Sequence, residues 1–141
     1  DHAGLEMKKK LFDFVKEKLK KQITDLGPKK YDGNDDYPDF AVKLAMEVAK
    51  NKDNVGILIC GSGHGMCVTA NKIKGIRASI GYSIQGAELA KKEDDINVLC
   101  LAGRILTNDH ASAIVKKFLE TKFDEAEKRT RRIQKIEELE K

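Results

Sequence analysis

The 141-residue chain has the length of one domain, and its 40% hydrophobic content is enough for one ordinary core, so we expect a single domain over residues 1–141. Aromatic residues make up only 6% of the chain and the net charge is +4, which argues against a nucleic-acid surface built on base stacking. The three cysteines are too few for a disulfide framework, and no run of about 18 apolar residues is present. We therefore expect a cytoplasmic protein that binds neither nucleic acid nor membranes.

The hydrophobic pattern predicts strands and helices in alternation. In chain order these are a helix at 5–21, a strand at 23–26, a helix that Pro38 opens and that ends near 49, a strand at 55–60, a helix at 66–72, a strand at 76–80, a helix at 84–92, a strand at 98–101 and a helix at 108–121. The continuous apolar runs at 55–60 and 98–101 are typical of strands buried on both faces. The alternation predicts a parallel sheet covered by helices on both sides.

The last segment, residues 125–141, is predicted to be a charged helix. Ile133, Ile136 and Leu139 lie on one side of it, but this apolar stripe is too thin to explain a long helix on the surface of a lone subunit. Two interpretations remain open. The segment is either a solvated tail or a helix that docks on a second subunit and brings basic residues to that subunit's site.

Cys60 and the glycine-rich loop after it are the candidate functional centre. Ligands of open parallel α/β sheets bind beyond the carboxyl ends of the strands, where the segment Cys60-Gly61-Ser62-Gly63-His64-Gly65 is expected. The N–H groups of such a loop can approach an anion closely. The loop lacks the nucleotide-binding motifs G-x-x-x-x-G-K-[ST] and G-x-G-x-x-G. Cys60 is either a thiol that these groups hold as a thiolate or a small buried hydrophobic residue.

Several short motifs follow one another in a fixed order along essentially the whole chain. They are Asp1-His2-Ala3-Gly4, Asp36-Tyr37-Pro38, the segment from Gly56 to Met66, Ala70-Asn71-Lys72, Gly75 to Ala78, Asn97-Val98-Leu99 and Gly103-Arg104. This collinear set resembles the ribose-5-phosphate isomerase B and galactose-6-phosphate isomerase family. The resemblance implies a Rossmann-like α/β/α domain with a five-stranded parallel sheet, a homodimer or dimer of dimers whose sites draw on both subunits, and no metal or cofactor.

The resemblance also implies a role for each candidate site residue. Cys60 would abstract the proton beside the sugar carbonyl, and the N–H groups of the loop, including those of Gly61, Gly63, His64 and Gly65, would stabilise the resulting cis-enediolate. Ser62 would move protons between the two oxygens. The implied substrate contacts are Asp1 to the sugar hydroxyls, Tyr37 at the pocket mouth, and His2, Arg104, Lys128 and Arg132 to the phosphate.

The sequence departs from the family at two places. The family has a short apolar strand ahead of the Asp-His pair, and we expect that strand to be missing from the sequence rather than from the protein. The family motif His-Asn-x-x-Asn, whose His opens the sugar ring, is replaced here by Glu93-Asp94-Asp95-Ile96-Asn97. Glu93 could serve as the general acid if repulsion from its acidic neighbours keeps it protonated, and His64 is an alternative donor.

Met66 stands where one branch of the family has a glutamate base, which leaves Cys60 as the candidate base. The resemblance therefore implies an aldose–ketose isomerase that converts ribose 5-phosphate to ribulose 5-phosphate. Because Glu93 replaces the ring-opening His, the alternatives are an isomerase of a hexose phosphate and a non-catalytic subunit that binds sugar phosphates. Nucleic-acid binding by the basic tail is disfavoured, because acidic residues interleave with the basic ones.

Overall fold

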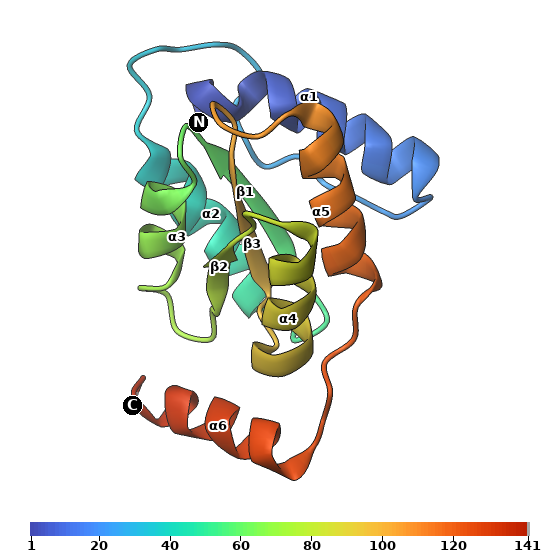
Figure 1. The fold of residues 1–141 in the computed structure, drawn as a ribbon. Helices are drawn as coiled ribbons and strands as arrows, with labels where there is room; N and C mark the ends of the chain where they lie inside the picture. The colour runs from blue at the N-terminus through green and yellow to red at the C-terminus, as the bar shows by residue number, and fades with distance from the viewer. Residues whose placement is uncertain (141) are drawn as a thin grey trace.

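The computed structural model describes residues 1–140 and has a parallel sheet at its centre (Figure 1). Its three strands are β1 (Gly56–Cys60), β2 (Ala78–Ile80) and β3 (Val98–Ala102), in the order β1-β3-β2. The register aligns Gly56 with Val98 and Cys60 with Ala102. Cys60 is therefore the last residue of β1, at the carboxyl edge of the sheet.

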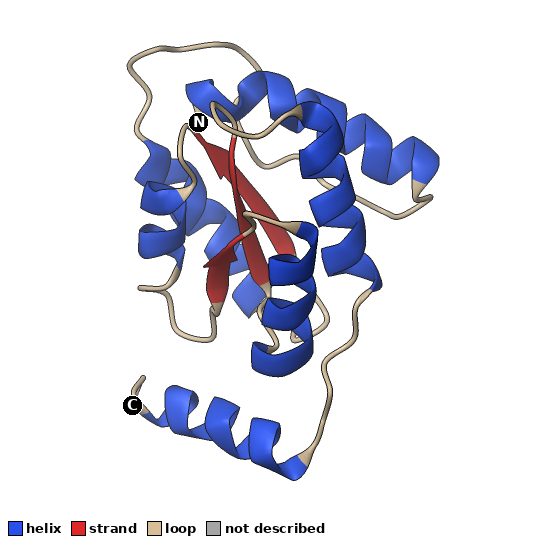
Figure 2. Ribbon diagram, viewed as in Figure 1, coloured by secondary structure: helices blue, strands red, loops and turns tan. Residues whose placement is uncertain are grey.

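Helices cover both faces of the sheet, which confirms the three-layer arrangement (Figure 2). The helical segments in chain order are a 3-10 turn (His2–Gly4), α1 (Leu5–Asp13), a π-helical turn (Phe14–Lys18), α2 (Tyr37–Ala49), α3 (His64–Ala70), α4 (Ile84–Asp94), α5 (Asn108–Glu120) and α6 (Glu127–Glu138). Pro38 lies in the first turn of α2, where its missing N–H costs no hydrogen bond. Ser83 and Thr107 cap α4 and α5 by accepting backbone N–H bonds at 2.9 and 3.1 Å.

The core consists of two apolar clusters, one on each face of the sheet. Leu99 and Leu101 of β3 pack in the cluster that includes α1, α4 and α5, whereas Val98 and Cys100 pack in the cluster that includes α2 and α3. Successive side chains of a strand point to opposite faces, so both sides of β3 must be apolar. All five residues of β3 are buried, as the continuous apolar run predicts.

The strand predicted at 23–26 does not form, and the described sheet has three strands rather than five. A groove of about 1170 Å³ lies beside β1, and residues 20–28 of the chain form part of its lining. Without a paired neighbour, an extended segment has no ladder to join. The first helix is also shorter than the predicted 5–21, because α1 passes into the π-helical turn and ends at Lys18.

Helix α6 packs against the end of α4, on the side of the molecule away from the N-terminus (Figure 1). Glu140, just after α6, accepts the Gly75 N–H at 3.0 Å, and Glu137 pairs with Arg77 at 3.7 Å. Ile133 is buried, but Leu139 is 84% exposed. The tail is thus an ordered helix that leaves part of its apolar stripe open. None of the helices in residues 1–140 has the length and hydropathy of a membrane span.

Candidate functional site

A pocket of about 550 Å³ opens at the carboxyl edge of the sheet. It is lined by residues from four separate segments of the chain: Asp1, His2, Ala3, Tyr37, Cys60, Gly61, Ser62, Gly65, Arg104 and Ile105. Most of these are residues that the sequence predicts for the site, and Ala3 and Ile105 are additions. The parallel sheet explains why these segments lie together, because it brings the segments that follow β1 and β3 to one edge.

Cys60, the last residue of β1, lines this pocket and is 5% exposed. Its Sγ accepts a hydrogen bond from the Gly63 N–H at 3.2 Å. This bond holds the Cys60 sulfur beside the backbone of the glycine-rich loop. The loop also places Ser62 at the surface, where its Oγ accepts the His64 N–H at 3.3 Å.

Two glycines of the loop give room to neighbouring side chains of the pocket. A Cβ on Gly61 would lie 3.2 Å from Arg104 Nη1, so the guanidinium group sits directly over the peptide that follows Cys60. A Cβ on Gly65 would lie 2.5 Å from the Tyr37 ring. Gly63 has a φ of 81°, a left-handed conformation that suits glycine. The glycine spacing therefore shapes the pocket as well as exposing N–H groups.

The turn Asp1–Gly4 packs directly on the strand ends. A Cβ on Gly4 would collide with the carbonyl of Ile59, and one on Gly103 would lie 2.8 Å from the Ala3 oxygen. Asp1 Oδ1 accepts the Ala3 N–H at 3.0 Å, which holds the turn closed. The motifs Asp-His-Ala-Gly and Gly-Arg, distant in sequence, are thus parts of one wall.

His2 is held by Asp35, a residue that the sequence reading missed. Asp35 Oδ1 lies 2.6 Å from His2 Nδ1 and also accepts the His2 backbone N–H at 3.2 Å. Burial opposes ionisation of Asp35, but the hydrogen bonds from His2 prevail and hold the pKa of this carboxyl below its usual range. Tyr31 packs edge-on against the His2 ring, with centroids 5.7 Å apart.

One oxygen or nitrogen atom from each of Asp1, His2 and Asp35 lies within 4.8 Å of the others, as metal ligands would. The 2.6 Å contact between His2 and Asp35, however, is a direct hydrogen bond, so these two groups already satisfy each other. The arrangement fits a polar triad better than a metal site.

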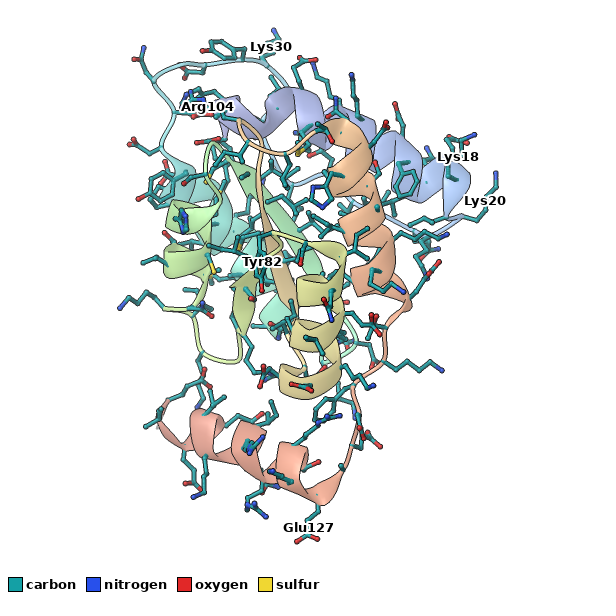
Figure 3. The ribbon with its side chains drawn as sticks, viewed as in Figure 1. Lys18, Lys20, Lys30, Tyr82, Arg104 and Glu127 are labelled. Atoms are coloured by element: carbon teal, nitrogen blue, oxygen red, sulfur yellow. The ribbon has the colours of Figure 1, made fainter. Side chains whose placement is uncertain are left out.

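The remaining predicted residues do not reach this pocket within one chain. Glu93 and Asp94 lie at the end of α4, and Lys128 and Arg132 lie exposed on α6. Figure 3 shows Arg104 at one end of the molecule and Glu127, the first residue of α6, at the other. Glu93 pairs with Arg129 at 3.1 Å, and Arg129 also bonds Asp124. The predicted site is therefore split into two groups at opposite ends of the subunit.

His64 and the other two cysteines take no part in lining the pocket. His64 is exposed at the start of α3. Cys67 of α3 is near Cys100 of β3, and hydrogen bonding from the Cys100 thiol lowers the pKa of Cys67 while the same contact raises that of Cys100. This pair lies in the α2 and α3 side of the core.

The chain is similar to proteins of one family over its whole length. The family model described as Ribose/Galactose Isomerase matches residues 1–136. A probable ribose-5-phosphate isomerase B of Mycoplasma genitalium is 46% identical over all of this chain and 92% of its own length, and the ribose-5-phosphate isomerase B of Mycobacterium tuberculosis is 35% identical over all of this chain and 86% of its own.

Solved structures agree with the sequence comparison. The crystal structure of ribose-5-phosphate isomerase B from Mycoplasma genitalium with bound ribulose-5-phosphate has a TM-score of 0.94 and 45% identity, covering 99% of this chain and 91% of that one. The isomerase structure from Thermotoga maritima has a TM-score of 0.91 and 37% identity, covering 98% and 93%. Family model, relatives and structures all lead to one conclusion: the chain belongs to the ribose/galactose isomerase family.

Proposed function

We propose that this chain, acting as a single domain, is a cytoplasmic ribose-5-phosphate isomerase of type B with Cys60 as its base. The observation that carries the proposal is the buried Cys60 thiol, which accepts the Gly63 N–H at the edge of a pocket containing acidic and basic side chains. The relatives named as ribose-5-phosphate isomerases support the substrate, and the free cysteines suit a reducing compartment.

In the proposed reaction the Cys60 thiolate removes the proton from C2 of the open-chain aldose. The electrons of that C–H bond form the C1–C2 double bond, and those of the carbonyl move to its oxygen, giving a cis-enediolate. In this proposal loop N–H groups donate to the oxyanion, a contribution of a few kcal/mol in other enzymes. Ser62 moves a proton between the oxygens on C1 and C2, and the Cys60 thiol returns its proton to C1. No proton is gained or lost overall.

The two sides of the pocket have different chemistry, which orients the sugar phosphate in this proposal. Asp1 supplies a carboxylate for hydroxyl groups, while His2 and Arg104 supply donors for the phosphate. Arg104 lies over Gly61, next to the Cys60 backbone. Its planar group can donate two parallel hydrogen bonds to a phosphate.

We also propose that two copies of the chain share each site, in a homodimer or a dimer of dimers. The split between the pocket and the group formed by Glu93, Asp94, Lys128 and Arg132 supports this. A two-fold axis would bring one subunit's second group to its partner's pocket. The exposed apolar residues Val68, Tyr82 and Leu139 offer surface for such an interface.

Mixing two inactive variants tests the shared site. Cys60→Ala and Arg132→Ala are each expected to be inactive as homodimers. Refolded together in equal amounts, half of the dimers are mixed, and one of the two sites in each mixed dimer is intact, so about a quarter of the parent activity returns. Activity that stays absent after mixing, with mixed dimers demonstrated by mass spectrometry, contradicts a site built from two chains.

A panel of phosphorylated sugars tests the reaction itself. NMR in deuterated water should detect exchange of the C2 proton of ribose 5-phosphate and formation of ribulose 5-phosphate. The ion pair between Glu93 and Arg129 favours two other outcomes, because it occupies the position of the ring-opening residue. Exchange confined to a hexose phosphate would change the substrate, and calorimetric binding without any exchange would identify a non-catalytic subunit.

We further propose that the groove beside β1 is filled by an extended segment running parallel to β1 into Asp1, which would also order residues 23–26 as a strand. Two features support a strand in this place. The Asp1 nitrogen donates to the Ile59 carbonyl at 3.2 Å, as the next bond of a parallel ladder would. The groove separates β1 from residues 22–28 and is lined by apolar side chains such as Val15, Ile57 and Leu119.

A further inference from the structure

One of the two nitrogen atoms of the His2 ring is hydrogen-bonded to another residue of the protein. Nδ1 lies 2.6 Å from Asp35 Oδ1, and two acceptor atoms cannot approach so closely, so Nδ1 carries the proton of this contact. The same oxygen accepts the His2 backbone N–H at 3.2 Å, which fixes the residue at two points. Because His2 lines the pocket, Nε2 is the ring atom left for a ligand.

The second oxygen of Asp35 is unusual. The side chain is 9% exposed, and within residues 1–140 no donor reaches Oδ2, which is buried. A buried carboxylate oxygen without a partner lowers stability, so its presence calls for an explanation. The carboxylate is joined by its other oxygen to His2, a residue that lines the pocket, so its position affects the pocket through the His2 ring.

We propose that Asp35 is a positioning residue for the phosphate of the substrate. It holds Nδ1 of His2, so that the Nε2 edge of the ring faces the phosphate, and it keeps the ring in the pocket that Arg104 also lines. The inference rests on the proposed function, since it assumes that the anion is the phosphate group of a sugar. Asp35 itself touches no substrate.

A merely structural role for Asp35 is the competing explanation. Asp35 lies near the end of the long loop before α2, and its loss would free that loop whatever His2 does. The two roles differ in one respect. A positioning residue acts through the His2 ring, so its replacement has no further effect on phosphate once that ring is gone.

The experiment measures binding of inorganic phosphate by calorimetry in a double-mutant cycle on the full-length protein. Asp35→Asn keeps the shape of the side chain and removes its charge. We expect it to raise the Kd of phosphate about tenfold, and to raise KM for ribose 5-phosphate similarly with kcat within about threefold. In a His2→Ala background the same change should alter Kd by less than about twofold. Asp36→Asn is the matched control, because that neighbouring carboxylate caps no helix N–H, and it should leave Kd unchanged.

Each outcome decides for or against the inference. An equal loss in both backgrounds, an unchanged Kd, or a loss of kcat alone would overturn it. Failure of the proposed function is recognised separately, because the parent protein would then bind phosphate without exchanging the C2 proton. Circular dichroism and thermal unfolding of every variant show whether the fold is retained.

Discussion

Replacing Cys60 with alanine removes the thiol that we expect to abstract the proton. Positioned general bases contribute on the order of 10²–10⁴-fold to the rate, so proton exchange at C2 should fall by about 10³-fold. Cys60 is 5% exposed, and its thiol accepts one N–H bond. Loss of the thiol should therefore lower the free energy of unfolding by about 1–2 kcal/mol. That cost is small against the roughly 5–15 kcal/mol of a typical domain, and the variant should fold.

NMR of ribose 5-phosphate in deuterated water measures the exchange directly, and calorimetry with inorganic phosphate checks that the pocket still binds. Cys100→Ala is the matched control, because it removes a buried thiol of the neighbouring strand from the same core cluster without touching the pocket. It should keep exchange within about threefold of the parent. If Cys60→Ala exchanges the proton within about tenfold of the parent, the thiol is not the base.

Three other predictions follow from the structure. If a strand fills the groove beside β1, the Ile59 amide should exchange its hydrogen slowly in the protein that has this strand, and at least about 100-fold faster in a variant from which the strand is deleted. Hydrogen exchange followed by NMR measures both rates, and fast exchange in both proteins would rule the strand out. Glu93→His should raise turnover of ring-closed ribose 5-phosphate several-fold, by about as much as an added general acid allows, while unchanged or lower turnover would indicate another acid or substrate. Burial opposes ionisation of Asp25, but hydrogen bonds from Lys8, the Gly27 N–H and Lys29 hold its pKa below the ordinary value of 3.8. The stabilisation that the Asp25 carboxylate provides is therefore complete above pH 3.8 and is lost as the pH falls through the folded-state pKa. Urea denaturation should accordingly show that Asp25→Asn loses less stability below pH 3.8 than the parent does.

Much of the fold could be predicted because its strongest signals are local. The structure confirms the two buried strands, β1 and β3, that the continuous apolar runs predict, and Pro38 correctly marks the start of α2. The strand at 23–26 was wrong for the described chain because a strand depends on a neighbour, which periodicity does not report. The helix predicted at 5–21 was too long for a similar reason, since the apolar spacing persists where the backbone widens into a π-helical turn.

The clustering of the pocket residues could be predicted for those that follow a strand end. Cys60, Gly61 and Arg104 meet because parallel topology brings the carboxyl ends of strands together. Asp35 could not be found in this way, since it lies in a polar loop whose path is decided by contacts made 33 residues away in sequence. The pairing of Glu93 with Arg129 is likewise a tertiary contact between two charged helices.

Parts of the pocket wall are peptide groups in close contact. Gly4 and Gly103 allow the first turn to pack on the strand ends, and Gly61 and Gly65 allow Arg104 and Tyr37 to approach the loop closely. These backbone parts of the wall cannot be remodelled by exchanging side chains one at a time. Evolution or laboratory selection for a longer or shorter sugar would therefore have to work at the rim, where Tyr37 and the 72% exposed Ile105 stand, while the interior stays committed to a single kind of chemistry.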